Sequence, residues 1–301
     1  METLIIVFFL ILSLLITFLA LRSPSQCIQS EILFKLMDAN LIEVSDPEKS
    51  TLVFDLPRSV RQTNTVVVTP GYPTVIDQGP WGACTAFAMR YAYLYWLAKT
   101  SKTIVEPSCS FWYAGSRLLV FASNPNYYKT MDDRGSTTSA TIQSITNHGT
   151  AALSAYPYSA SSIFVSPFHP NLNTAVTRFT DLVFTRIPVY ARINKIPAWQ
   201  VQGEAFAAQI DAGKAVLASF KVYTNLQTIK VYKSGVIPLP AGSVLGGHAI
   251  CLIGYARDTI PSKNVFFFYN SWGTYTGNNG YFTIPWQYIA DATKSGDYWS
   301  I

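Results

Sequence analysis

The chain has 301 residues, of which 49% are hydrophobic and 14% aromatic, and its formal net charge is +5. This composition supports a large buried core, in one large or two modest domains, and it excludes a disordered protein. The sequence contains no cluster of lysines and arginines interleaved with aromatic residues, so we expect no nucleic-acid partner.

The N-terminal segment predicts a membrane helix. Residues 4–21 form an apolar run, broken by only two hydroxyl residues, that is long enough to span a bilayer. A cleaved signal peptide is the alternative and would make the protein secreted or lumenal, but the basic start and small-residue cleavage site are missing. We therefore expect residues 1–22 to be an uncleaved, single-pass anchor. Glu2 before and Arg22 after the run favour a cytosolic catalytic part.

Weaker patterns follow this anchor. Residues 28–41 place apolar side chains on one helical face, which predicts a surface helix within a mainly polar tether. Residues 51–54 and 65–68 are rich in β-branched side chains, and we expect a strand in each.

Residues 77–88 predict a loop that delivers a cysteine to the start of a helix. Glycines punctuate the loop, and from Cys84 to about Ala98 the apolar side chains recur at helical spacing. A cysteine at this point meets unpaired backbone N–H groups and the positive end of the helix dipole, and both favour a thiolate. Gln78, six residues upstream, could donate its amide to an oxyanion beside the sulfur. The alternative is an inert buried cysteine.

The remaining chain divides into a helical part and a β-rich part. A helix is expected from Thr138 to Asn147, ended by His148 and by Gly149, which suits a helix C-cap. From about Phe179 onward the pattern becomes short β-type runs with a single short helix at 204–212. These runs cover residues 182–189, 215–223, 249–255, 265–269 and 281–284.

Two of these runs carry residues that complete a catalytic pattern. His248 precedes the run at 249–255, and Asn270 ends the run at 265–269. A Cys nucleophile, a His base and an Asn that orients the imidazole form one of the known triads. The other histidines are weaker candidates: His148 is explained by the helix dipole, and His169 lies in a Pro-rich loop with no strand to fix it.

With these residues in place, the sequence resembles the papain-like (C1) cysteine peptidases over most of its length. Gln78, Cys84, His248 and Asn270 match, in order, that family's oxyanion-hole glutamine, nucleophile, base and orienting residue. The run Asn270-Ser271-Trp272-Gly273 is an especially specific part of the match. The pattern is closest to the bacterial and large-virus branch of the family, so a viral source is one possibility.

The resemblance implies an α+β, papain-like two-domain fold, in which a helical domain packs against a mostly β, barrel-like domain with the active site in the cleft. It implies a peptidase domain over residues 52–301. The helical half would span about 70–178, and the β-rich half about 179–301 together with 52–68. Residues 23–51 would then be either a tether or a short pro-segment that lies over the active-site groove.

The resemblance also implies roles around the triad. We assign Gly246, Gly247, Ala249 and Trp272 to substrate binding, with a roomy pocket beside the glycines. Trp272 would in addition shield the hydrogen bond between the histidine and the asparagine from solvent. The expected partner is a peptide or protein substrate, and the sequence does not indicate an oligomeric state.

The four cysteines are Cys27, Cys84, Cys109 and Cys251, and they show no metal-binding spacing. We therefore expect no metal or organic cofactor. Secreted relatives carry a disulfide cysteine where this chain has Trp81, and residues 135–138 replace the family's Cys-Gly-Gly type motif. A chain with a core of this size does not depend on cross-links, so we expect no disulfide.

These features predict a membrane-anchored cysteine endopeptidase that works through a thioester acyl-enzyme. Two alternatives remain open. A Cys-His-Asn acyltransferase would form the same thioester and pass the acyl group to an amine. A catalytically silent, membrane-tethered binding protein could also use a peptidase fold, although the complete set of four site residues argues against it.

Overall fold

The computed structural model describes residues 66–68, 73–121, 133–159, 176–189, 196–291 and 293–301. The predicted anchor at 4–21, the predicted tether and the first β-type run at 51–54 all lie outside these ranges. Among the described residues, no helix combines the length and the apolar character needed to cross a bilayer.

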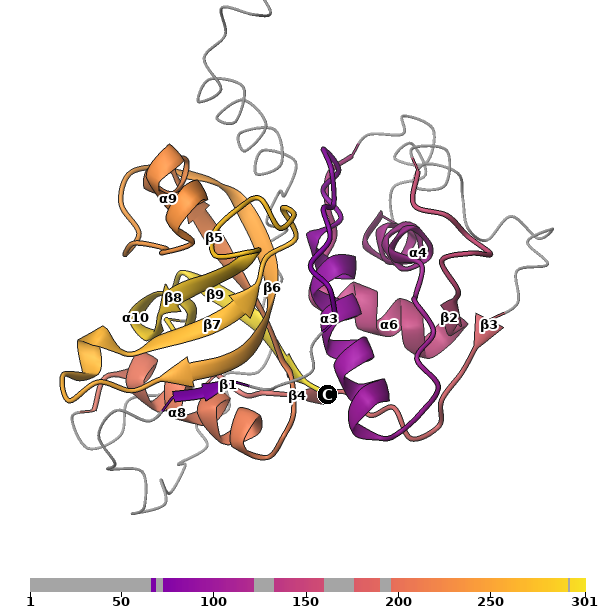
Figure 1. The fold of residues 1–301 in the computed structure, drawn as a ribbon, viewed down its shortest axis with the longest axis horizontal. Helices are drawn as coiled ribbons and strands as arrows, with labels where there is room; N and C mark the ends of the chain where they lie inside the picture. Colours follow the sequence, from indigo (N-terminus) through magenta and orange to yellow (C-terminus); the bar gives the residue numbers. More distant parts are fainter. Residues whose placement is uncertain (1–65, 69–72, 122–132, 160–175, 190–195, 292) are drawn as a thin grey trace, which may run out of the picture.

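Three helices pack together on one side of the molecule (Figure 1). They are α3 (Cys84–Lys99), α4 (Cys109–Phe121) and α6 (Thr138–His148). A two-stranded sheet of β2 (Thr150–Ala151) and β3 (Val176–Thr177) accompanies them. The expected C-cap of α6 is confirmed, because Gly149 has a φ of 81° and donates its N–H to the Ile145 carbonyl.

Helix α4 was not predicted, although its start carried a signal. The Ser108 hydroxyl oxygen accepts the Phe111 N–H at 3.1 Å, as an N-cap serine does. The same hydroxyl donates to the Tyr156 carbonyl at 2.6 Å. The sequence analysis made no use of this capping serine.

Helix α3 lies between the other two helices and the sheet (Figure 1). The sequence predicted one apolar face, but every residue from Cys84 to Leu97 is buried. This happens because neighbours cover both sides: Cys109 and Trp112 come from α4, whereas Leu217 and Cys251 come from strands. The first turn of α3 is therefore held within a packed interior.

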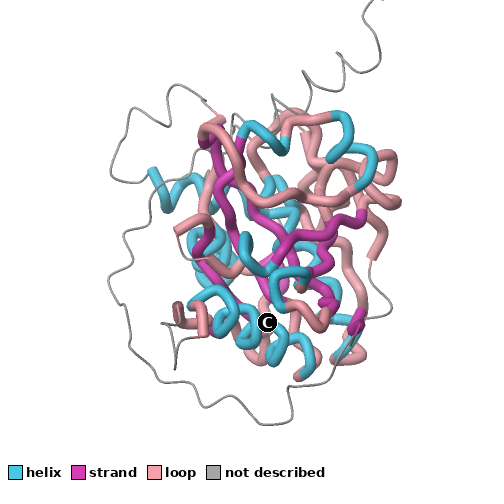
Figure 2. The backbone as a smooth tube through the Cα atoms, turned by 90° about the vertical axis from the view of Figure 1, so that its left-hand side faces the viewer, coloured by secondary structure: helices cyan, strands magenta, loops and turns pink. Residues whose placement is uncertain are grey.

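Seven strands form the large sheet, in the order β4-β9-β5-β6-β7-β8, with β1 paired to β6. Figure 2, which looks onto the β-rich half, shows these strands twisting across the molecule. In the described part of the chain, the end strands β4 and β8 do not pair, so the sheet is open. Its members are β1 (Val66–Val68), β4 (Thr185–Arg186), β5 (Val216–Tyr223), β6 (Val244–Ala256), β7 (Val265–Tyr269), β8 (Tyr281–Pro285) and β9 (Ser295–Ser300).

Several predicted boundaries change in the structure. Strand β6 starts five residues before the predicted run, because Gly246 and Gly247 weaken the sequence signal while pairing with β5. The run at 182–189 yields only the two residues of β4, and β9 was not predicted. Helix α8 (Ala198–Asp211) begins earlier than expected, after Pro197. Two further helices of the β-rich half, α9 (Ile229–Ser234) and α10 (Trp286–Ile289), were not predicted.

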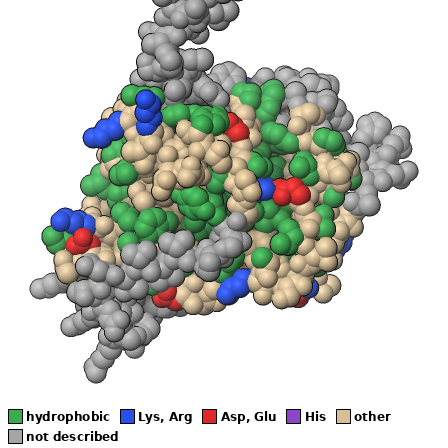
Figure 3. Space-filling view, in the orientation of Figure 1, with side chains coloured by type: hydrophobic (Ala, Val, Ile, Leu, Met, Phe, Trp, Pro, Cys, Tyr) green, Lys and Arg blue, Asp and Glu red, His purple; other side chains and the backbone are tan. Residues whose placement is uncertain are grey.

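Successive side chains of β5 and β6 enter two different cores, as the two-residue period of a strand requires. Leu217 and Cys251 face α3, whereas their neighbours Ala218 and Ile250 face the core beneath α8 and α10. This sheet thus joins the two halves of an α+β fold. On the face shown in Figure 3, charged side chains are dispersed in small groups over both halves.

Candidate active site

Cys84 is the first residue of α3, and its sulfur lies where the two halves meet. The backbone N–H groups of Ala249, Thr85 and Cys84 itself are directed at the sulfur, and Ala249 belongs to β6 in the other half. Burial raises the pKa of the thiol to about 11, while these three N–H groups act to lower it. Two of these N–H groups, those of Cys84 and Thr85, belong to the first turn of α3.

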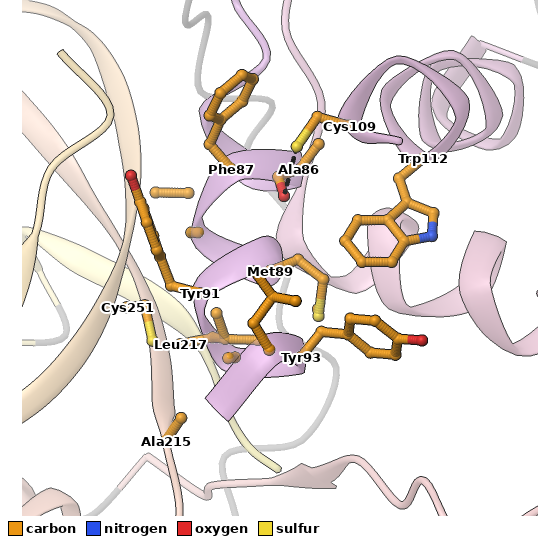
Figure 4. Close-up of a cluster of buried hydrophobic side chains, with 14 of the residues drawn as sticks. Ala86, Phe87, Met89, Tyr91, Tyr93, Cys109, Trp112, Ala215, Leu217 and Cys251 are labelled. Carbon is orange, nitrogen blue, oxygen red and sulfur yellow. Dashed lines mark hydrogen bonds between the residues drawn. The ribbon is translucent and has the colours of Figure 1, made fainter. Parts of the chain in front are cut away.

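Cys109 provides a contrast with Cys84. Its sulfur lies 3.8 Å from the Ala86 carbonyl oxygen, to which it donates, and burial raises its pKa to about 12 (Figure 4). A thiol that donates to a carbonyl is stabilised in its protonated form. Cys84, Cys109 and Cys251 are all free thiols, and Cys27 lies outside the described residues.

His248 and Asn270 are brought together at 2.8 Å, between Nε2 of the ring and Oδ1 of the amide. The same Oδ1 accepts the Ser271 N–H at 2.9 Å, which identifies it as an acceptor. The hydrogen of the neutral ring must then reside on Nε2, since two acceptors cannot bond to each other. Nδ1 is left as the atom that can take a proton from a thiol.

Aromatic rings enclose the imidazole. The Trp272 ring lies 5.2 Å from that of His248 at an interplanar angle of 32°, and the Phe220 ring meets it edge-on at 5.8 Å. Burial lowers the pKa of His248 to about 4, while the hydrogen bond with Asn270 acts to raise it. A lone charge on either the ring or the thiol is thus disfavoured, whereas proton transfer between them leaves the net charge unchanged.

Gln78 is fully buried and fixed by four hydrogen bonds. Its Nε2 donates to the Trp81 carbonyl at 2.7 Å, and its Oε1 accepts from the Ser271 hydroxyl. Its backbone N–H donates to the Ser271 carbonyl at 2.8 Å, and its carbonyl accepts from Tyr158 at 2.6 Å. One hydrogen of the side-chain NH₂ remains available to a further acceptor.

The other predicted site residues lie beside this group. Gly246 and Gly247 pair with β5, opposite Val222 and Lys221, and both are buried. Ala249 is the residue whose N–H reaches the Cys84 sulfur.

His148 lies apart from this group, in the last turn of α6, and His169 lies outside the described residues. Burial and the positive charge of Arg178 lower the pKa of His148. The charge that the sequence assigned to this helix end is therefore disfavoured.

Two residues that hold the loop before Cys84, Asp133 and Tyr113, were not predicted from the sequence. Asp133 accepts the Gly82 N–H at 2.7 Å and a hydrogen bond from Tyr113, two contacts that reach the loop before Cys84. In the sequence, Asp133 stands in a charged stretch that is typical of a solvated loop, so no local signal marked it. Among the described residues, no three His, Cys, Asp or Glu side chains gather as a metal ion would require.

Comparison with known proteins identifies the family. The family profile described as Papain family cysteine protease matches residues 61–291. The chain is 27% identical over 241 residues to an uncharacterised peptidase C1-like protein of Acanthamoeba polyphaga mimivirus. The aligned region covers 78% of this chain and 72% of the mimivirus protein. It is 25% identical over 217 residues to the cathepsin B-like CP3 of Giardia intestinalis, over 70% of this chain and 64% of the relative.

Solved structures show the same fold. Xylellain, a cysteine protease from Xylella fastidiosa, has a TM-score of 0.65 at 21% identity, covering 89% of this chain and 96% of its own. Digestive procathepsin L 3 of Tenebrio molitor has a TM-score of 0.59 at 17% identity, and the match covers 92% of this chain and 81% of that protein. The mimivirus relative agrees with the large-virus part of the branch that the sequence pattern indicated. Since the family profile covers most of its length, the chain belongs to the papain family of cysteine proteases.

Proposed function

We propose that this protein is a cysteine endopeptidase with Cys84 as nucleophile and His248 as general base. The observation that carries this proposal is the buried pair of His248 and Asn270, at 2.8 Å, next in sequence to the Ala249 N–H that reaches the Cys84 sulfur. Chain order, burial and hydrogen bonding all fit this assignment.

In the proposed reaction, Nδ1 of His248 takes the proton of the Cys84 thiol, and the thiolate attacks the carbonyl carbon of a peptide bond. The imidazolium then protonates the leaving amine, which departs and leaves a thioester on the enzyme. His248 next removes a proton from water, which attacks the thioester and releases the acid product. Asn270 keeps the ring oriented throughout, and as a neutral group it adds no charge of its own.

The oxyanion formed in each step needs donors that are in place beforehand. We assign the backbone N–H of Cys84 and the remaining hydrogen of the Gln78 side chain to this task. The bonds of Gln78 to Trp81 and Ser271 support the assignment, because they restrict its amide to one orientation.

We assign substrate contacts to Gly246, Gly247, Ala249 and Trp272, in a cleft between the halves. The absence of side chains at the two glycines supports a roomy pocket on this side of Cys84. The substrate class that follows is an extended peptide or protein segment.

For the rest of the chain we propose an anchor over residues 1–22, a tether or short pro-segment over 23–51, and a peptidase domain over 52–301. The apolar run at 4–21 supports a membrane-anchored protein, with secretion after signal-peptide cleavage as the alternative. Deleting residues 1–22 should give an enzyme that partitions into the aqueous phase and retains its turnover. A native N-terminus at or beyond Ser23, found by mass spectrometry, would contradict the anchor.

The central test uses an epoxysuccinyl peptide inhibitor, which alkylates an activated thiol. Peptide mapping should locate the label on Cys84 alone, with Cys109 and Cys251 unmodified in the same sample as internal controls. A silent binding protein would remain unlabelled. Product analysis with an added amine acceptor separates the acyltransferase, which would give the amide in place of the acid.

A further inference from the structure

The loop before Cys84 is tied to the helical half by one carboxylate. Asp133 Oδ2 accepts the Gly82 N–H at 2.7 Å, across 51 residues of sequence. Its other oxygen, Oδ1, accepts from the Tyr113 hydroxyl, and Tyr113 is a fully buried residue of α4. Gly82 stands only two residues before the proposed nucleophile, so this contact holds the chain just before helix α3.

Helix α3 has no side-chain acceptor at this end, where the Ala83 carbonyl accepts the Ala86 N–H at 3.0 Å. Its N-cap residue is Ala83, and no side-chain cap is present. The loop also has no covalent link, because the cysteines of the described residues are free thiols. Asp133 instead holds the residue before the N-cap: its bond to the Gly82 N–H fixes the chain that enters the helix, and it does not cap an N–H of the helix itself.

The negative charge of Asp133 makes ionisation of the nearby Cys84 thiol less favourable. Its negative charge raises the pKa of the Cys84 thiol, in opposition to the three backbone N–H groups that lower it. Arg117, a cation of α4, lies over the Tyr113 ring at 5.5 Å. The negative charge of Asp133 disfavours the thiolate form in which Cys84 would react. Any benefit of Asp133 to the reaction therefore comes from the hydrogen bond that it accepts from Gly82.

We propose that Asp133, held by Tyr113, is a positioning residue that fixes the Cys84 loop through the Gly82 N–H. The proposal rests on the proposed function of Cys84 as nucleophile. Two effects of Asp133 are then separable: its hydrogen bond places the sulfur, and its charge reduces the fraction of thiolate.

Two substitutions separate these effects. Asp133→Asn keeps an oxygen that accepts the Gly82 N–H, and its NH₂ can donate to the Tyr113 oxygen, but the charge is lost. We expect kcat/KM within about threefold of wild type, while Cys84 is alkylated severalfold faster below neutral pH because more of it is thiolate. Asp133→Ala loses both contacts, and kcat should fall on the order of ten- to a hundredfold with KM little changed.

A matched control exists in the other half of the molecule. Tyr255 donates to Asp211 Oδ1 at 2.6 Å, which is the same Tyr–Asp pair placed away from the site. Asp211→Asn should change thermal stability at most, and it should leave both the alkylation profile and kcat at wild-type values. Tyr113→Phe, which retains the charge of Asp133 but removes its support, should lower kcat severalfold without accelerating alkylation.

The experiment measures two quantities on the same full-length variants: peptide turnover, and the rate of iodoacetamide labelling of Cys84 against pH, read by peptide mapping. Wild-type kcat in Asp133→Ala would overturn the positioning role. Identical alkylation profiles for wild type and Asp133→Asn would overturn the effect assigned to the charge. If Asp133→Ala does not fold, Asp133→Asn and Tyr113→Phe still decide. Turnover that survives in Cys84→Ala would instead refute the proposed nucleophile, and the alkylation data would remain interpretable.

Discussion

The two sides of the proposed active site are held by different means. On the base side, His248 belongs to β6, a 13-residue strand that pairs with β5 over residues 244–252, His248 included, and with β7 over residues 251–256. On the nucleophile side, Cys84 follows an irregular loop that depends on side-chain contacts from Asp133 and Gln78. A ladder of backbone hydrogen bonds survives most side-chain changes, whereas a loop fixed by single side chains does not.

Substitutions that remove supporting contacts should therefore cost more activity around the loop than along the sheet. The direct participants are expected to give the largest effects, since they act on the reacting atoms themselves. The variants below test this difference from the largest expected effect to the smallest.

Cys84→Ala removes the nucleophile and should lower kcat/KM by on the order of 10⁴-fold or more, with the fold preserved. Peptide hydrolysis and far-UV circular dichroism measure the two outcomes. Cys109→Ala and Cys251→Ala are the controls: both sulfurs are buried, so these variants should lose stability while retaining turnover. Equal losses of turnover in all three variants would contradict the special role of Cys84.

Gln78→Ala removes the proposed oxyanion donor and should lower kcat by about 10²- to 10³-fold, with a smaller change in KM. Ser271→Ala sharpens the test, because it removes only the hydroxyl that holds Gln78 Oε1. A loss of a few-fold in Ser271→Ala would show that support on the loop side matters. No loss in Gln78→Ala would move the oxyanion site elsewhere.

Asn270→Ala removes the group that orients the imidazole and should lower kcat on the order of a hundredfold. The ring then retains its contacts with Trp272 and Phe220. Phe220→Leu is the matched control on the sheet side, and it should cost only a few-fold in steady-state kinetics because the hydrogen bond remains. The reverse order of these two losses would show that packing, and not Asn270, orients the ring.

The last prediction concerns protonation on the base side. In Cys84→Ala the ring has no thiolate partner, so burial should hold the pKa of His248 near 4, and adding Asn270→Ala should lower it further. An NMR titration of the ring measures both values. Below pH 6.5 the unfolded chain binds a proton that the folded state does not, so the stability of Cys84→Ala should fall as the pH decreases toward 4. A pKa near 6.5 would mean that water reaches the ring.

The same difference between the two sides explains what could be predicted from sequence. The α+β class, the family and the helix from Cys84 follow from strong local patterns. Asp133 and Tyr113 were not predictable, because their role arises only when Asp133 meets Gly82, which lies 51 residues earlier in the chain. Strand β9 and the full length of β6 were missed for a related reason: pairing with β5 stabilises glycine-containing stretches that have little strand preference of their own.

The division of the proposed site between the two halves has a consequence for biosynthesis. Chains of this size fold in parts, with N-terminal regions emerging from the ribosome first. Cys84 can occupy the start of α3 early, but the Ala249 N–H and the imidazole arrive only after β6 has paired within the sheet. A partly synthesised chain therefore lacks the proposed catalytic group until β6 has paired, so we expect proteolytic activity only after most of the chain has been made.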